Sequence, residues 1–330
     1  HFLGSVNLAV GRYGGNTSAN HMFDGQLTHV HYIDGTAYAA SDFGETDTTT
    51  GIWKPKTAPS VTYGNNGYFL KMDNAANMGL DSGGGSNNMT TSGTIIQQKD
   101  TPSNVFATLN PLSGADTMAV NTTFSNVNNT VVCSGSVYNA FGSTLGVSKG
   151  KYYAEFKTNS APGDGMIGIF AKLGASGNYL GSQTHQYCWY NASGGNIRSN
   201  SSNIVTSVGT YTTNDIIGIA LDCDNNKLYI HKNGTYISNG SGTGDPTNGT
   251  NGISITDPDD TDLGFYFMSA MDWGGSTRGN WSANFGNGFF GTTAVSSAQN
   301  PSDGIGIFEY SVPSGYKALC TKSINAQEYS

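Results

Sequence analysis

The stretch that decides the fold reads Asp215-Ile-Ile-Gly-Ile-Ala-Leu-Asp-Cys-Asp-Asn-Asn-Lys-Leu-Tyr-Ile-His-Lys-Asn-Gly234. Two apolar runs flank Asp224-Asn225-Asn226, whose residue types tolerate positive φ, and Asn233-Gly234 ends the second run with a hairpin turn. Apolar residues alternate along both runs, so one face of each strand is expected to be buried. The positions concerned are Ile217, Ile219 and Leu221 in the first strand, and Leu228 and Ile230 in the second.

The rest of the chain has the composition of a β protein. Of 330 residues, 46 are glycine and only 12% are charged, so few stretches have the content that sustains helices. Short strand-like runs recur with turn residues between them, as expected for a sandwich or barrel. Besides the opening stretch, they cover residues 130–133, 151–157, 166–172, 186–190, 263–268 and 281–285. We predict an all-β fold whose main body is an antiparallel β-sandwich.

The chain divides into three parts. Residues 1–72 carry short amphipathic runs such as 27–33, which breaks at Asp34-Gly35, and predict a small N-terminal β module. Residues 73–117 are first rich in Gly, Asn and Ser, then contain two prolines, and are expected to be a linker and an extended connection. Residues 118–330 are expected to form the sandwich. A few strands cannot bury their apolar face alone, so we expect residues upstream of His1 or a neighbouring chain to complete the N-terminal module.

Charge and hydropathy exclude two classes of partner. The formal net charge is −8 with only 15 Lys and Arg and no basic run, so a nucleic-acid partner is not expected. The apolar runs are far shorter than the ~20 residues of a membrane span. The four cysteines, Cys133, Cys188, Cys223 and Cys320, lack the CxxC spacing of a metal site. Three disulfide pairings are conceivable, and buried free thiols or at most one bridge are favoured.

The C-terminal pattern resembles the SPRY family. The hairpin at residues 215–234 looks like the signature of that family, and supporting pieces follow its order from about residue 118 to 324. These pieces are Gly150–Phe156, Ile167–Phe170, Asn284–Gly286 and Pro313–Leu319. The resemblance implies a SPRY-like sandwich, which is a variety of concanavalin-like jelly roll.

The N-terminal part resembles the closing strands of a laminin-G/concanavalin-like domain. This likeness rests on Phe23–Gly35, Phe43–Glu45 and Gly51–Pro55, although such a domain is much longer. Together with Tyr63–Phe69 and Asp100–Pro111, this order before a SPRY module is similar to structural proteins of marine bacteriophages. The resemblance implies a virion-exterior protein, such as a fibre, appendage or capsid decoration. Its partners would be copies of itself, other virion proteins, or a host surface protein or glycan; the alternative is a secreted or cell-surface carbohydrate-binding lectin.

No catalytic residues are expected. Glycosidases need two carboxylates that flank the bond, and the glutamates Glu45, Glu155, Glu309 and Glu328 do not form the strand pattern of acids that such enzymes carry. A Gly-x-Ser-x-Gly elbow is absent from the sequence. The prediction is therefore a non-enzymatic protein.

Calcium is the one cofactor that the sequence leaves open. Residues 222–226 look like the start of an EF-hand loop but lack its Gly and closing Glu, so a hairpin turn is favoured. Four carboxylates gather in a second loop, at Asp257, Asp259, Asp260 and Asp262. This loop is the better calcium candidate, against the alternative of a solvated acidic loop.

Ligand recognition is expected in the loops at one end of the sandwich, where a rigid scaffold presents variable segments. Aromatic and arginine side chains anchor interfaces most often, although a sandwich of this size also needs aromatic residues for its core. The candidates are Tyr179, His185, Trp189, Tyr190, Arg198, Trp273 and Arg278.

Overall fold

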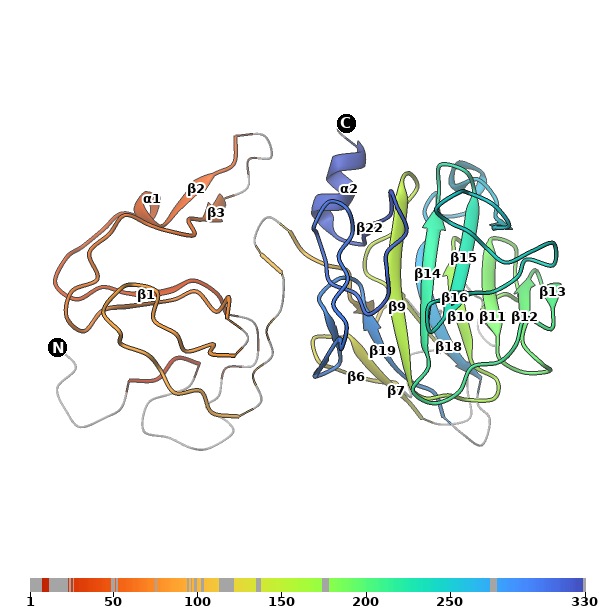
Figure 1. Cartoon of the computed structure of the whole chain (residues 1–330), viewed down its shortest axis with the longest axis horizontal. Helices are drawn as coiled ribbons and strands as arrows, with labels where there is room; N and C mark the ends of the chain where they lie inside the picture. Colours follow the sequence, from red (N-terminus) through yellow and green to blue (C-terminus); the bar gives the residue numbers. More distant parts are fainter. Residues whose placement is uncertain are drawn as a thin grey trace. The chain divides into compact units, whose positions relative to one another are not determined.

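The computed structural model divides the chain into two compact units, residues 1–97 and 98–330, which are described separately (Figure 1). The structure describes residues 8–11, 23, 25, 27–48, 51, 53–74, 76–93, 95, 97, 100, 101, 104–112, 122–134, 138–173, 178–273 and 278–328, without the side chains of residues 138–140, 273 and 328. Within this part of the chain, no helix is long and apolar enough to cross a membrane.

The N-terminal unit contains two small antiparallel ladders. One pairs β1 (Val30–Tyr32) with β4 (Tyr68–Leu70), and the other pairs β2 (Gly44–Thr46) with β3 (Trp53–Pro55). A short helix, α1 (Ala40–Phe43), precedes β2. Stacked rings join the first ladder, because the His31 ring lies 4.1 Å from the ring of Phe69.

The segment expected to be a linker, residues 73–117, is shared between the two units. In the N-terminal unit, the Asp81 carboxylate accepts hydrogen bonds from the backbone N–H groups of Phe69, Gly83 and Asn87 at 2.7–2.9 Å. In the C-terminal unit, Phe106 forms a β-bridge with Cys320, and the two residues after Thr108 form strand β5. Asp81 and residues 106–110 of the segment are therefore tied to ordered structure.

A seven-stranded sheet forms one layer of the C-terminal unit. Its order is β13-β12-β11-β10-β18-β8-β5, and every neighbouring pair is antiparallel. The strands are β5 (Leu109–Asn110), β8 (Tyr138–Ser143), β10 (Met166–Phe170), β11 (Gln186–Tyr190), β12 (Asn196–Ser199), β13 (Ser202–Thr206) and β18 (Phe267–Trp273).

A nine-stranded sheet forms the second layer. Its main path is β16-β15-β14-β9-β19-β7-β6, while β17 pairs with β15 and β22 runs parallel to β9. The strands are β6 (Thr122–Ser125), β7 (Thr130–Cys133), β9 (Lys151–Ser160), β14 (Ile216–Asp222), β15 (Lys227–Lys232), β16 (Thr235–Tyr236), β17 (Ile253–Ser254), β19 (Asn280–Asn284) and β22 (Lys317–Ala318). Outside the two sheets lie the hairpin of β20 (Phe289–Phe290) and β21 (Thr293–Ala294), the 3-10 turn η2 (Pro258–Asp260) and the helix α2 (Thr321–Glu328).

The hairpin predicted at residues 215–234 is confirmed. Strands β14 and β15 are antiparallel, with Ile219 opposite Ile230, and Asn226 in the connecting turn has φ 54°. The next turn has φ 49° at Asn233 and φ 83° at Gly234, the two positive values that a tight hairpin turn requires. All five apolar positions predicted for the inner face lie in the main core, at 0–1% exposure.

Residues of both sheets fill this core, so the predicted antiparallel β-sandwich is confirmed as the fold (Figure 1). One predicted strand is misplaced. The run at 263–268 was expected to be extended throughout, but β18 begins only at Phe267. Gly264 has φ 72°, and Tyr266 makes only an isolated bridge with Val147 before the strand starts.

The four cysteines are free and buried, which resolves the open question of their pairing in favour of thiols. Cys188 lies on β11, and its Sγ donates to the carbonyl of Leu180 at 3.1 Å. Burial raises the pKa of the Cys188 thiol to about 12. These thiols therefore behave as small core side chains.

A chain of buried polar groups lies on the outer face of the nine-stranded sheet. The backbone N–H of Gly234 donates to His231 Nδ1 at 3.1 Å, which leaves the ring proton on Nε2. That nitrogen lies 2.6 Å from the Tyr153 hydroxyl, which donates to Glu155 Oε1 at 3.0 Å. Backbone N–H groups of Glu309 and Tyr310 donate to the same carboxylate at 2.9 and 2.8 Å. Glu155 thereby fastens the C-terminal segment to the sheet.

Candidate ligand-binding site

Strand register divides the loops of the C-terminal unit between two ends of the seven-stranded sheet. Phe170 is paired with Gln186 and with Phe267 at one end, whereas Met166 is paired with Tyr190 and Met271 at the other. The turn at residues 200–201 joins β12 to β13 and lies at the Phe170 end, because Cys188 is paired with Arg198. We call this the pocket end, since the same turn lines the pocket described next.

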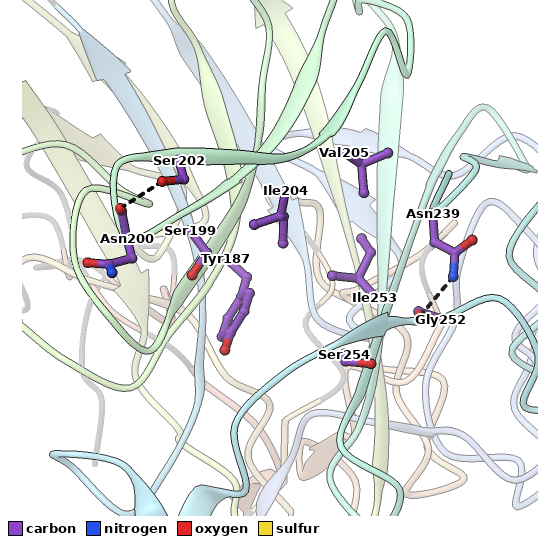
Figure 2. A pocket seen from close by; sticks show the side chains of 10 residues that line it. All are labelled: Tyr187, Ser199, Asn200, Ser202, Ile204, Val205, Asn239, Gly252, Ile253 and Ser254. Atoms are coloured by element: carbon purple, nitrogen blue, oxygen red, sulfur yellow. Dashed lines mark hydrogen bonds between the residues drawn. The ribbon is translucent and has the colours of Figure 1, made fainter. Parts of the chain in front are cut away.

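A pocket of about 570 Å³ lies beside the edge strand β13 (Figure 2). Its walls come from β11, β12 and β13 of the seven-stranded sheet and from β17, which belongs to the other sheet. The pocket is thus framed where the two layers of the sandwich face each other at their margin. The lining residues are Tyr187, Ser199, Asn200, Ser202, Ile204, Val205, Asn239, Gly252, Ile253 and Ser254.

The apolar part of the lining consists of aliphatic side chains and one tyrosine. Figure 2 shows Ile204, Val205 and Ile253 grouped between the turn at Asn200 and the strand at Ser254. Ile204 is 46% exposed, which is high for an isoleucine in a strand. The ring of Tyr187 is fixed, since its hydroxyl contacts Thr256 Oγ1 and accepts from the Thr256 backbone N–H, both at 3.1 Å.

The polar part of the lining is held in place by hydrogen bonds. Asn239 Oδ1 accepts from the backbone N–H groups of Ser241 and Gly242 at 2.9 and 3.2 Å, and its Nδ2 donates to the Gly252 carbonyl at 3.3 Å. Lys227 Nζ donates to Ser254 Oγ at 2.8 Å. Because these contacts are made within the protein itself, the polar side chains are preorganised.

Arg198 contacts the turn at residues 200–201, which lines the pocket. Its guanidinium lies 4.8 Å from the ring centroid of Tyr179 and 5.0 Å from that of Tyr190. One terminal nitrogen donates to the Tyr179 hydroxyl at 3.0 Å and to the Ser201 carbonyl at 3.3 Å. Stacking and donation together direct the guanidinium onto the turn.

The same turn is also tied to the loop before β11. The backbone N–H of Asn200 donates to the Gln183 carbonyl at 3.1 Å, and that of Ser201 donates to the Gly181 carbonyl at 2.9 Å. The Ser201 hydroxyl donates to the Ser182 carbonyl at 2.8 Å. Arg198 and this loop therefore set the position of one pocket wall.

The seven predicted recognition residues do not form a single surface. Three of them are in contact: Arg198 stacks on the rings of Tyr179 and Tyr190 and holds the turn at residues 200–201. His185 lies at the pocket end, where its Nδ1 is 2.9 Å from an Asp262 oxygen, and Lys172 Nζ is 2.9 Å from the other oxygen. The hydrogen bond from Lys172 lowers the pKa of Asp262.

The other three predicted residues lie elsewhere. Trp189 is a core residue at 1% exposure, and its Nε1–H donates to the Gly209 carbonyl at 2.9 Å. Trp273 ends strand β18, and its side chain lies outside the described residues. Arg278 follows that strand, near Asp272, whose pKa is raised chiefly by burial and lowered in part by Arg278. Both belong to the end opposite the pocket.

The acidic loop considered for calcium uses two of its four carboxylates internally. Asp257 caps η2 by accepting from the backbone N–H of Asp259 at 3.0 Å, and it also accepts from Asn226 Nδ2 at 3.0 Å. Asp262 is occupied by Lys172, as noted above. In the part of the chain that the structure describes, no group of three or more His, Cys, Asp or Glu side chains could hold a metal ion.

Sequence reasoning missed the pocket because most of its lining is small and polar. The residues from Asn196 to Thr206 look like a loop, since only Ile197, Ile204 and Val205 are large and apolar. The available signal was an isoleucine–valine pair after a polar turn, which is compatible with an edge strand.

No protein-family model matches the sequence. A search of curated proteins finds no match. Among solved structures, the chain is similar to the crystal structure of the SPRY domain of human HERC1, with a TM-score of 0.39 and 14% sequence identity. This likeness covers 49% of the present chain and 91% of the HERC1 chain.

Proposed function

We propose that this chain is a non-enzymatic recognition protein on the exterior of a bacteriophage virion, where it serves as a fibre, appendage or capsid decoration. Its sandwich binds a molecule of the host surface through the pocket beside β13. The observation that carries the proposal is the preorganised lining of that pocket, whose polar groups and supporting turn are fixed by hydrogen bonds within the protein. Binding sites gain affinity from such preorganisation.

The chemistry of the pocket supports binding without catalysis. Its ten lining residues include no Asp, Glu, His, Cys or Lys, and the hydroxyl of Tyr187, the one lining side chain that could transfer a proton, is engaged with Thr256. The buried carboxylate of Glu155 is already surrounded by donors, among them two backbone N–H groups. Glu309 is engaged with Ser296. A purified sample is expected to release no reducing sugar from laminarin, agarose or alginate.

The virion setting is supported by the order of modules in the sequence. The laminin-G-like strands of residues 1–72, followed by the SPRY-like body, are similar to the arrangement in marine bacteriophage structural proteins. In such a setting, copies of the chain or other virion proteins would complete the N-terminal module. A secreted or cell-surface lectin is the second candidate, because the uncharged pocket lining suits a glycan in either setting.

The decisive experiment combines localisation with a binding assay. Cryo-EM of purified particles is expected to find the chain on the virion surface, and the labelled chain is expected to bind host cells. Ile204→Arg should abolish cell binding, because it places a long cation in the pocket. Val132→Arg is the matched control, since Val132 is 42% exposed on β7, away from the pocket.

Absence of the chain from particles, together with its secretion by a cell, would replace the proposal with the lectin alternative. Equal loss of binding in both arginine variants would show that the pocket is not the contact surface.

A further inference from the structure

We infer that the pocket beside β13 binds an uncharged, polyhydroxylated ligand, namely a neutral hexose unit of a glycan. This inference rests on the proposed recognition function and narrows it to one chemical class. It follows from three properties of the pocket: the absence of charge in its lining, the presence of polar groups on both sides of an apolar surface, and the hydrogen-bonding capacity that remains on those polar groups.

The first property concerns charge. None of the ten lining residues carries a formal charge. Lys227, a cation at the rim, donates to Ser254 Oγ at 2.8 Å and keeps its charge outside the lining. A carboxylate, sulfate or phosphate on the ligand would thus lose hydration without gaining a cationic partner in the lining, which is costly. Uronates, sialic acids and phosphorylated ligands are therefore disfavoured.

The second property is the division of the lining into apolar and polar surface. Tyr187, Ile204 and Ile253 present ring and aliphatic surface, while Asn200 and Ser202 on one side of the pocket and Ser254 on the other present amide and hydroxyl groups (Figure 2). A pyranose ring matches this division, because it has an apolar C–H face and a rim of hydroxyl groups. A purely aliphatic ligand would cover these polar groups and leave them without hydrogen bonds, at a cost for each group.

The third property is the hydrogen-bonding capacity of these polar groups. Ser254 Oγ accepts from Lys227, so its own proton is available to a ligand. The Ser202 hydroxyl donates to the Asn200 carbonyl at 3.4 Å, so its oxygen can still accept. The Asn200 amide carries both a donor and an acceptor. Donors and acceptors thus lie on both sides of the apolar surface, and the hydroxyl groups around a sugar ring can use them because each hydroxyl both donates and accepts.

The test uses the whole chain on an array of oligosaccharides of matched length. Neutral laminarin and agarose oligosaccharides are compared with alginate oligosaccharides, in which every unit carries a carboxylate, and with a set of uncharged peptides. We expect retention by at least one neutral series and none by alginate or peptides. Ser254→Ala should weaken binding to the retained series about fivefold, as expected for one lost hydrogen bond.

Two variants keep this result interpretable. Ser302→Ala removes an exposed serine hydroxyl in the C-terminal segment and should leave affinity unchanged. Ile204→Arg should abolish retention, and its melting temperature shows whether the variant is folded. If Ser254→Ala and Ser302→Ala behave alike, the pocket is not the glycan site.

Failure of this inference can be distinguished from failure of the proposed function. If the chain binds host cells and Ile204→Arg prevents it, while only alginate or peptides are retained on the array, the ligand class is wrong and the recognition function stands. If the chain binds neither cells nor any array member, both are overturned.

Discussion

The buried pair of His231 and Glu155 makes a specific prediction about stability and pH. Burial lowers the pKa of His231 from 6.5 to about 3 and raises that of Glu155 from 4.5 to about 7. The pKa of His231 is lower in the folded chain than in the unfolded chain. Its contribution to the free energy of unfolding is therefore complete above pH 6.5 and is lost as pH falls toward 3. Because the folded pKa of Glu155 is raised, its contribution is complete below pH 4.5 and is lost as pH rises toward 7.

The two effects oppose each other in the window from pH 4.5 to 6.5, which both titrations share. Each pH unit in that window changes the free energy of unfolding by up to about 1.4 kcal/mol per group, with opposite signs. Integrated from pH 4.5 to 7.5, each group accounts for about 3 kcal/mol. The wild-type chain should therefore show little net pH dependence from this pair.

Single substitutions should reveal the pH dependence that each of the two residues contributes. In Glu155→Gln only the histidine effect remains, so stability relative to the wild type should fall by about 3 kcal/mol as pH decreases from 7.5 to 4.5. In His231→Gln only the glutamate effect remains. Stability relative to the wild type should therefore rise by about the same amount as pH decreases from 7.5 to 4.5. The glutamine at 231 can still accept from Gly234 and donate to Tyr153.

Urea unfolding followed by tryptophan fluorescence measures these differences, because Trp189 and Trp281 are buried in the sandwich. Glu45→Gln serves as the matched control, since Glu45 is exposed in the N-terminal unit and pairs with Lys54 at 3.3 Å. The reasoning is refuted if the pH profile of Glu155→Gln is parallel to that of the wild type, or if Glu155→Gln and His231→Gln shift the profile in the same direction.

Three further predictions follow from packing and exposure. Gly218→Ala should lower stability by about 1–3 kcal/mol in urea unfolding, because the added methyl group would lie 1.9 Å from His231 Nε2; an unchanged midpoint would contradict this close approach. Arg198→Lys should weaken ligand binding about tenfold, since lysine cannot stack on the two rings and also donate to the turn. Titration with the retained glycan measures the affinity, and an unchanged affinity would show that Arg198 does not hold the pocket wall in place. The four thiols should resist a water-soluble thiol reagent in native protein and react in urea, and rapid native labelling would show that the burial is wrong.

The sequence by itself determined the central hairpin and the fold class. Alternating apolar residues fix which face of β14 and β15 is buried, and Asn233-Gly234 favours the two positive φ angles of its turn. These are local properties, because strand alternation and turn conformation depend on near neighbours in the chain. The residue at which β18 begins could not be predicted from its near neighbours, because Tyr266 forms a bridge with Val147, a residue far away in the sequence.

Only the tertiary structure decided the candidate site. Tyr187, Ile204 and Ser254 lie on three different strands, and they line one pocket because β13 of one sheet comes to face β17 of the other. The roles of single residues were likewise settled by strand faces. Arg198 and Tyr190 point to the outer side, where the guanidinium stacks, whereas the neighbouring Trp189 points into the core. Residue type alone made all three candidates for ligand recognition. Because side chains alternate between the two faces of a strand, Trp189 packs in the core while Arg198 and Tyr190 lie on the opposite face.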